Sequence, residues 1–216
     1  MNQKIKNSLI SFSIFLSLWL WIIAPIALFL IWKYSGWSHK SKIIGTISTI
    51  FLASMPLILI FIYAFFYRPF QVSGISMLPN HPQGQYLMAK IYRRDRFKLN
   101  RGDVVIFRAP PAMNCLDKLG CNYIHRIIGL PGETVEIRDG KVLLNGQVLD
   151  ESAYLFVDVV TEIGAFMRNQ GQVVIPVDQY FVMGDNRPLS SDSRQWGLVP
   201  EDLIIGRVAF CYANCK

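Results

Sequence analysis

The N-terminal third of the chain contains two long runs without a charged residue, Leu9–Trp32 and Ile43–Phe66, each of 24 residues. As α-helices they would each be about 36 Å long, which exceeds the roughly 30 Å hydrocarbon core of a bilayer. A cleaved signal peptide is the alternative for the first run. It requires a shorter apolar core and a small-residue cleavage site, and here a second apolar run follows ten residues later. The sequence therefore predicts a membrane anchor over residues 1–67, with both runs as transmembrane helices.

The distribution of charge argues against a nucleic-acid partner. The formal net charge is +7. Residues 1–67 hold five lysines and no acid, whereas residues 68–216 hold 17 basic and 15 acidic groups. A basic face for phosphates would need this surplus in the folded domain. Because the surplus lies at the ends of the apolar runs, it indicates membrane topology instead.

The short flanks of the two runs predict their orientation. The connecting loop, Lys33–Lys42, carries three lysines. Short cytoplasmic loops are enriched in Lys and Arg, so we expect this loop to be cytoplasmic. Two spans then place residues 68–216 outside the cytoplasm. In a bacterium this would be a multi-pass protein of the inner (cytoplasmic) membrane, with its large domain on the extracytoplasmic, periplasmic side.

Residues 68–216 have the pattern of a β domain. Short segments rich in β-branched and aromatic residues recur, and no helical period of useful length is present. Residues 134–149 predict a β-meander, because the pairs Asp139-Gly140 and Asn145-Gly146 suit two-residue turns. We therefore expect a mainly β extracytoplasmic domain, barrel-like or built of folded antiparallel sheets.

The four cysteines form two close pairs, Cys115 with Cys121 and Cys211 with Cys215. Zinc sites favour tighter pairs, so metal binding is disfavoured and no metal ligand is assigned. In an oxidising compartment, disulfides are favoured over free thiols. Four cysteines allow three connectivities, and this sequence pattern alone leaves them open.

Four further segments resemble the boxes of type I signal peptidases, in the order that this family has them. The resemblance covers residues 69–210. The boxes are Pro69–Pro79, which contains Ser-Met-Leu-Pro; Arg101–Phe107; Tyr123–Glu133; and Gly184–Arg187 with Ser190–Pro200.

The resemblance implies a serine nucleophile and a neighbouring general base. Ser76 takes the place of the nucleophile, and a serine hydroxyl needs a base to remove its proton during attack. His125 occupies the position where bacterial members of the family have a lysine. The endoplasmic-reticulum and archaeal relatives use histidine there. Histidine has an ordinary pKa near 6.5 and can accept a proton at neutral pH. Two alternatives remain: a structural strand histidine with a satisfied hydrogen bond, and a remote lysine, such as Lys118 or Lys141, acting as the base.

Supporting residues follow from the last box. Ser190 matches the serine that hydrogen-bonds the base in the lysine enzymes. Asp192 is the candidate to orient the imidazole; the alternative is a salt bridge between Asp192 and either Arg194 or Arg126.

Substrate-binding residues are expected around the nucleophile and the base. In some family members a serine two residues before the nucleophile helps to bind the oxyanion, but here that residue is Gly74. Small apolar pockets would suit the Ala-x-Ala end of a signal peptide bound as an added strand. Their candidate residues are Val72, Ile75, Met77 and Ile124; for each, ordinary core packing is the alternative.

The sequence thus predicts a membrane-bound serine endopeptidase that removes signal peptides from exported preproteins. Its partners are preprotein signal peptides and the lipid bilayer, with no nucleic acid and no cofactor. Two alternatives remain. One is a maturation peptidase with a narrow substrate, like those of conjugative transfer systems. The other is a non-catalytic, membrane-tethered β domain that binds peptides.

Overall fold

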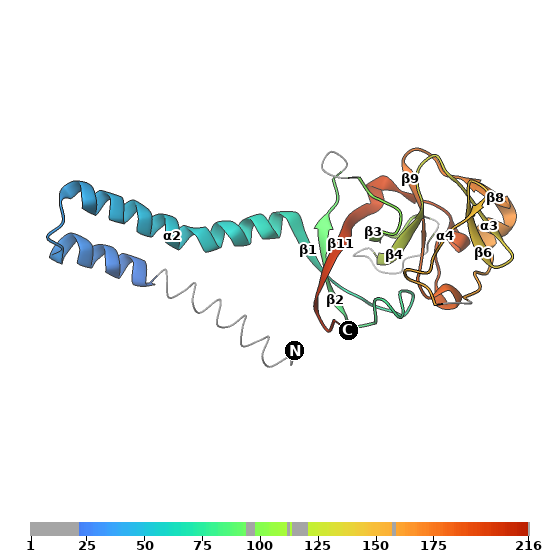
Figure 1. Ribbon diagram of the computed structural model, residues 1–216, viewed down its shortest axis with the longest axis horizontal. Helices are drawn as coiled ribbons and strands as arrows, with labels where there is room; N and C mark the ends of the chain where they lie inside the picture. Colours follow the sequence, from blue (N-terminus) through green and yellow to red (C-terminus); the bar gives the residue numbers. More distant parts are fainter. Residues whose placement is uncertain (1–21, 94–97, 112, 114–120, 157–158, 216) are drawn as a thin grey trace. The chain divides into compact units, whose positions relative to one another are not determined.

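The computed structural model describes residues 22–215, except 94–97, 112, 114–120 and 157–158. The chain divides into two compact units, one ending at Phe65 and the other beginning at Phe66. The first unit is helical and the second is mainly β (Figure 1).

The helical unit contains the membrane anchor. A shorter apolar helix, Ile22–Tyr34, precedes α2 (His39–Phe66), which has 28 residues and contains Pro56. Residues His39–Phe61 have a mean hydropathy of 2.2, are long enough to cross a bilayer, and include no buried residue in their most apolar stretch. The predicted span 43–66 therefore lies within α2. Of the predicted span 9–32, only residues 22–32 are among the described residues, so the structure describes one helix of spanning length and a shorter one.

The loop between these helices is held by polar contacts. Trp32 Nε1 donates to Thr46 Oγ1 at 2.9 Å, and Lys42 Nζ donates to the Trp32 carbonyl oxygen at 3.1 Å. The Trp32 and His39 rings meet edge to face, with 5.6 Å between their centroids. These contacts gather polar and amphipathic side chains around the loop that joins the two apolar helices.

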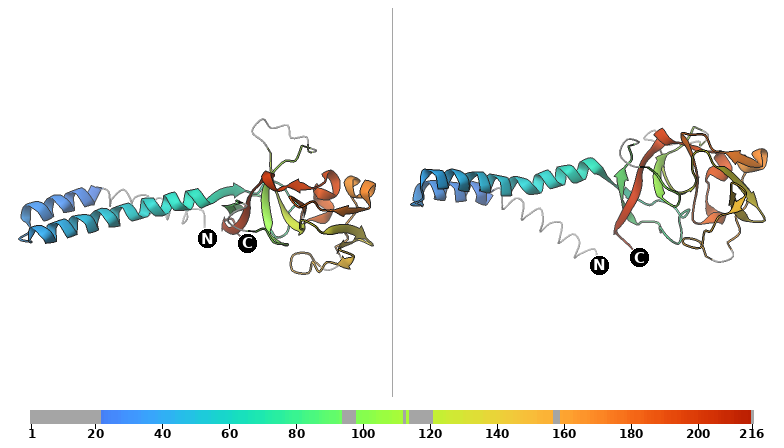
Figure 2. Two further views of the ribbon diagram at one scale, coloured as in Figure 1. Left: turned by 90° about the horizontal axis from the view of Figure 1, so that it is seen from above. Right: turned by 45° about the horizontal axis from the view of Figure 1, so that its top comes forward.

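The larger sheet of the β unit has seven antiparallel strands. In spatial order they are β1 (Tyr67–Gln71), β2 (Tyr86–Ile91), β11 (Ile204–Ala213), β3 (Val104–Arg108), β4 (Asn122–Gly129), β9 (Gln179–Met183) and β10 (Val199–Pro200). The C-terminal strand β11 therefore lies between β2 and β3, and Figure 2 shows it running along these earlier strands.

The smaller sheet has four strands and confirms the predicted meander. Its order is β7 (Gln147–Val148), β6 (Lys141–Leu144), β5 (Thr134–Arg138) and β8 (Gln172–Val174). Both turns use positive φ at two successive residues: 50° and 72° at Asp139-Gly140, and 50° and 80° at Asn145-Gly146. Two-residue turns of this kind match the twist of antiparallel strands.

The expected mainly β domain of antiparallel sheets is confirmed, and two details need correction. Both sheets are open, so the barrel-like alternative is wrong. Short helices are also present where no helical period was found: α3 (Ala165–Gln170), α4 (Ser193–Trp196), and the one-turn 3-10 helices η1 (Arg187–Leu189) and η2 (Glu201–Leu203). Helices of three to six residues are too short to show a 3.6-residue period, which explains why the pattern missed them.

Three clusters of buried side chains form the core of the β unit. Val104 and Ile106 of β3 belong to one cluster, with Ile124 of β4. Val105 and Phe107 belong to another. This alternation is the period of two expected of a strand buried on both faces. The third cluster lies mainly between the smaller sheet and its neighbours α3 and β9.

Candidate active site

The nucleophile candidate Ser76 lies in the turn that follows β1. The two ends of this turn are joined by Val72 N–H donating to the Gln85 carbonyl and Gly84 N–H donating to the Val72 carbonyl, both at 2.9 Å. Met77 is completely buried and packs with the cluster under β2, β3 and β4. Ser76 itself is half-buried. The turn, residues 72–85, is therefore anchored at its base and by one apolar side chain, which leaves the neighbouring serine accessible.

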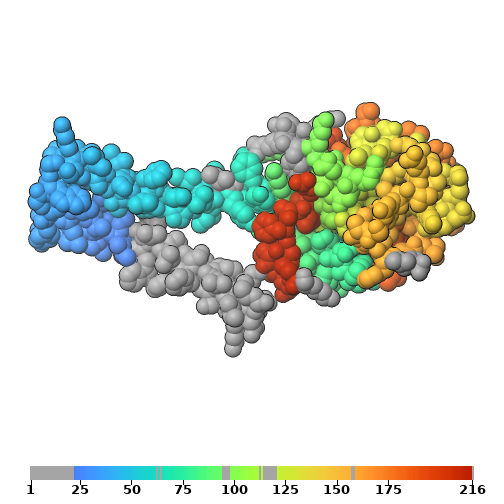
Figure 3. All heavy atoms as spheres, in the orientation of Figure 1, coloured from blue at the N-terminus to red at the C-terminus, as the bar shows by residue number. Residues whose placement is uncertain are grey.

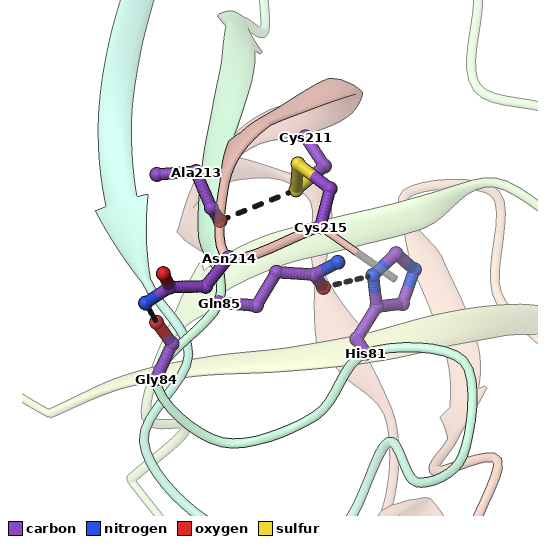
Figure 4. Close-up of a disulfide and its surroundings, with 7 residues drawn as sticks. All are labelled: His81, Gly84, Gln85, Cys211, Ala213, Asn214 and Cys215. Carbon is purple, nitrogen blue, oxygen red and sulfur yellow. Dashed lines mark hydrogen bonds between the residues drawn. A yellow bond between two sulfur atoms is a disulfide. The ribbon is translucent and has the colours of Figure 1, made fainter. Parts of the chain in front are cut away.

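The C-terminus of the chain braces the same turn (Figure 4). Asn214 Nδ2 donates to the Gly84 carbonyl at 2.9 Å, and His81 Nδ1 lies 3.0 Å from Gln85 Oε1. Cys211 and Cys215 form a disulfide beside these contacts, with their Cα atoms 5.8 Å apart. Cys121 is also disulfide-bonded, while Cys115 lies outside the described residues.

The loop after β9, residues 184–192, packs against the nucleophile turn. Asn186 N–H donates to the Ser76 carbonyl at 2.9 Å, and Asn186 Nδ2 donates to the Ile75 carbonyl at 3.0 Å. A Cβ on Gly184 would lie 2.5 Å from the Ser76 carbonyl oxygen and 2.2 Å from Ser190 Oγ. Only a residue without a side chain allows this approach, so Gly184 lets both the Ser76 carbonyl and the Ser190 side chain pack against its backbone.

His125 lies on β4, opposite Val105 of β3, and is 1% exposed. Its Nε2 is 3.2 Å from Ser190 Oγ. The rings of Phe107 and Trp196 flank the imidazole, with centroids 5.6 Å and 6.4 Å away. Among the described residues, neither His125 Nδ1 nor Trp196 Nε1 has a hydrogen-bond partner. The structure thus connects His125 to Ser190, and Ser190 through Gly184 to Ser76.

Burial makes this histidine a weak proton acceptor. Removal from water disfavours the imidazolium and lowers the pKa of His125 from 6.5 to about 4. The charges of Asp192 and Asp185 act in the opposite direction, and Arg194 adds to the lowering. The imidazole is therefore neutral at physiological pH, the form that a general base requires.

Asp192 pairs with Arg194 inside the protein. Arg194 Nε and Nη2 donate to its two carboxylate oxygens at 2.8 Å each, and Gly184 N–H donates at 3.1 Å. Burial by itself raises the pKa of Asp192, but hydrogen bonding to Arg194 and its positive charge bring that pKa below its usual value. Since this carboxylate also accepts the Arg194 N–H as the N-cap of α4, it organises the loop under His125.

Arg126, the residue after His125, forms a second buried ion pair. Its Nε donates to Asp185 Oδ1 at 2.8 Å, and its Nη1 donates to the Gly102 carbonyl at 2.8 Å. Asp185 is the neighbour of Gly184. This pair therefore ties β4, which carries the base candidate, to the loop that contacts Ser76.

The structure separates the four residues considered for substrate pockets. Val72, Met77 and Ile124 are 4% exposed or less and lie together in the core, whereas Ile75 is 43% exposed. Sequence reasoning missed the aromatic walls of the base. Trp196 lies within the last box, but nothing in the sequence distinguished Phe107 from the other apolar residues of its strand.

The backbone conformation at residue 74 suits the glycine found there rather than a serine that could help to bind an oxyanion. Gly74 has a φ of +103°, a conformation that side chains rarely adopt, so a serine would be strained there. The Ser76 N–H makes no hydrogen bond to a residue that the structure describes. It is available as a backbone donor.

No group of three or more metal-ligating side chains that could hold a metal ion occurs within the described parts of the chain. What the site presents is a hydroxyl in an anchored turn, beside a loop that hydrogen-bonds a buried neutral imidazole. Carried on a β domain that follows an apolar helix, this arrangement is typical of a membrane-anchored serine endopeptidase.

The comparisons identify the family. Residues 34–213 match the family described as "Signal peptidase, peptidase S26". The chain therefore belongs to the S26 signal peptidases: it is a membrane-anchored serine endopeptidase with type I signal peptidase activity, which removes signal peptides.

Individual relatives agree with this assignment. The chain is 34% identical to signal peptidase IB of Staphylococcus aureus (strain COL) over 182 residues, covering 79% of this chain and 90% of the relative. It is 35% identical to the probable signal peptidase I-1 of a Synechocystis strain over 161 residues, covering 74% and 78%. A solved signal peptidase I from Enterococcus faecalis shares 32% identity and covers 52% of this chain and 98% of its own, with a TM-score of 0.42.

Proposed function

We propose that Ser76 and His125 form the catalytic dyad with which this signal peptidase cleaves exported preproteins. The observation that carries the proposal is the contact between Ser190 Oγ and His125 Nε2, on a loop that also hydrogen-bonds the Ser76 carbonyl. His125 is the residue of the Tyr123–Glu133 box whose base position the family fills with lysine or histidine.

The proposed reaction uses the groups in a fixed order. Ser76 Oγ attacks the scissile carbonyl while His125 takes its proton, and the oxyanion forms near the Ser76 N–H. The resulting imidazolium donates a proton to the leaving amine, and the acyl-enzyme remains on Ser76. Water, activated by the same imidazole, then releases the signal peptide.

Asp192 has a structural role in this proposal. Its carboxylate already accepts two hydrogen bonds from the guanidinium of Arg194 and one from Gly184 N–H. Ser190 is instead the residue that positions His125 Nε2. This arrangement favours the salt-bridge alternative for Asp192 over direct orientation of the imidazole.

The signal-peptide end is proposed to bind as an added strand before the nucleophile. Ile75 is the exposed member of the four pocket candidates and adjoins Ser76 in the chain. Val72, Met77 and Ile124 would form the apolar surface beneath the bound peptide, against which its small side chains pack. Small residues such as alanine fit a shallow surface of this kind.

Cleavage of a purified preprotein by the purified full-length protein in detergent tests this function. Mass spectrometry of the products should locate one cut after a small residue at the end of the signal peptide. Several unrelated preproteins should be cleaved. Cleavage of one substrate only would favour the narrow maturation peptidase, and binding without cleavage would favour the non-catalytic β domain.

Two membrane spans and a periplasmic β unit complete the proposal. They are supported by α2, by the apolar helix Ile22–Tyr34, and by the three lysines of residues 33–42. A reporter that works only outside the cytoplasm should be active when fused after Lys216 and silent when fused at Gly36. The reverse pattern would contradict the orientation, and activity at both positions would contradict the second span.

A further inference from the structure

We propose that a cleft beside Ser76 binds the mature part of the preprotein, the residues that follow the scissile bond. The inference builds on the family's activity and assigns a specificity site to the leaving segment. The cleft has a volume of about 630 Å³. Its walls are residues 78–79 of the nucleophile turn, residues 185–188 of the loop after β9, and residues 154–156, 159–160 and 162.

Residues close to Ser76 line the cleft on two sides. Leu78 and Pro79, two and three residues after Ser76, line it on one side. Asn186, which donates to the Ser76 carbonyl, lines it on another. Figure 3 shows the blue-green to green surface of the nucleophile turn adjoining the yellow to orange surface of the later segment. A preprotein whose scissile bond lies at Ser76 therefore has this cleft within a few residues of that bond.

The position of the general base indicates which half of the substrate, the signal peptide or the mature segment, enters the cleft. The leaving amine must receive its proton from the general base, so the departing segment lies on the base's side of the scissile bond. Ser190, which contacts His125 Nε2, belongs to the same loop as Asn186 and Pro188 of the cleft wall. None of the four candidates for the signal-peptide side lines the cleft.

The floor of the cleft is tied to the catalytic strand. Asn80 Nδ2 donates to Asp185 Oδ2 and to the Tyr154 carbonyl, both at 2.8 Å. The Arg126 guanidinium, paired with Asp185, lies 4.4 Å from the Tyr154 ring centroid. A preformed floor reduces the ordering cost of binding, so contacts made there can contribute to kcat/KM.

The chemistry of the walls selects apolar side chains. Phe156 and Val160 are 71% and 65% exposed. A second cavity of about 440 Å³ shares Leu155, Phe156 and Val159 with the first, so the apolar surface continues toward β6. An extended peptide that leaves Ser76 can bury apolar side chains along this path.

Glu162, in the wall of the cleft, adds a preference for a basic side chain in the substrate. Asp185 and Arg187 are both in ion pairs, with Arg126 and Glu151. Glu162 is exposed, and its carboxylate makes no hydrogen bond or ion pair with a described residue. The occupant is therefore a mature segment with apolar side chains near its start and a basic side chain that can approach Glu162.

Matched substrates test the apolar site. Two preproteins would share one signal peptide and the first mature residue, and differ at mature residues 2–5: all serine, or leucine and valine. The wild-type protein is expected to cleave the apolar substrate about tenfold more efficiently in kcat/KM, because part of each side chain becomes buried. A Phe156→Ser, Val160→Ser double variant should remove this preference, so that it cleaves the two substrates with similar kcat/KM.

The controls keep the test independent of the dyad. Val177→Ser changes another exposed valine, 79% exposed, that does not line the cleft, and it should retain the preference. Glu162→Lys should invert the preference between substrates with lysine and glutamate in the mature segment. Cleavage of the serine substrate reports the catalytic site separately. The proposal is overturned if the double variant keeps the apolar preference, or if the wild-type protein shows none.

Discussion

His125→Ala is expected to abolish preprotein cleavage about as completely as Ser76→Ala. Nucleophile and base act as a unit, so loss of either should reduce kcat/KM by about 10⁴-fold or more. The measurement is cleavage of a purified preprotein, quantified over several hours. Circular dichroism and thermal unfolding must show that both variants keep the fold, because His125 packs between Phe107 and Trp196.

His125→Lys separates a base from a merely structural histidine. The position is 1% exposed, and Asp192 is already paired with Arg194, so a lysine there would be desolvated without a free carboxylate beside it. Desolvation lowers a lysine's pKa. We therefore expect His125→Lys to retain more activity than His125→Ala, with an acid limb at higher pH. Wild-type activity in His125→Ala would refute the dyad and direct attention to Lys141, at the start of β6, and to Lys118, outside the described residues.

The second prediction is that the enzyme keeps its activity well below the ordinary pKa of histidine. The sequence alone predicts an acid limb of kcat/KM at pH 6–7, because an unperturbed histidine titrates there. Burial lowers the pKa of His125 to about 4. The neutral base thus persists to lower pH, and the acid limb should lie near pH 4. A limb near pH 6.5 would contradict this burial-shifted base.

Stability must be measured over the same pH range. Because the folded-state pKa lies below the unfolded value, the unfolded chain binds the proton first as pH falls, and folding free energy is lost between about pH 6.5 and pH 4. Lowering the pKa of His125 from 6.5 to about 4 corresponds to a loss of ~3 kcal/mol at low pH. The free energy of unfolding, measured with denaturant at each pH, reports this loss. The His125→Ala variant should lose less stability over the same pH range. Cleavage at low pH is interpretable only where the protein remains folded.

Local patterns were sufficient for several elements of this protein. The uncharged stretch of α2 and the absence of acids in the first 67 residues predict a membrane anchor, since the cost of burying charge in lipid is independent of the fold. The turns at Asp139-Gly140 and Asn145-Gly146 predict the meander, because positive φ is a local property of these residues. The four boxes likewise mark the segments that meet at the site.

Only the tertiary structure decided the order of the strands, the partner of Asp192 and the burial of His125. No sequence pattern could show that β11 inserts between β2 and β3, since β11 pairs with residues about 100 or more positions earlier in the chain. The alternatives left open for Asp192 depended on which side chains the fold brings to its carboxylate, and the geometry pairs it with Arg194. The aromatic walls of His125 come from β3 and α4, so the burial that lowers its pKa follows from packing rather than from neighbouring residues in the chain. The sequence indicated the groups that we propose to carry the chemistry, Ser76 and His125, and the fold determined how strongly their surroundings alter them, because desolvation is a property of the assembled core.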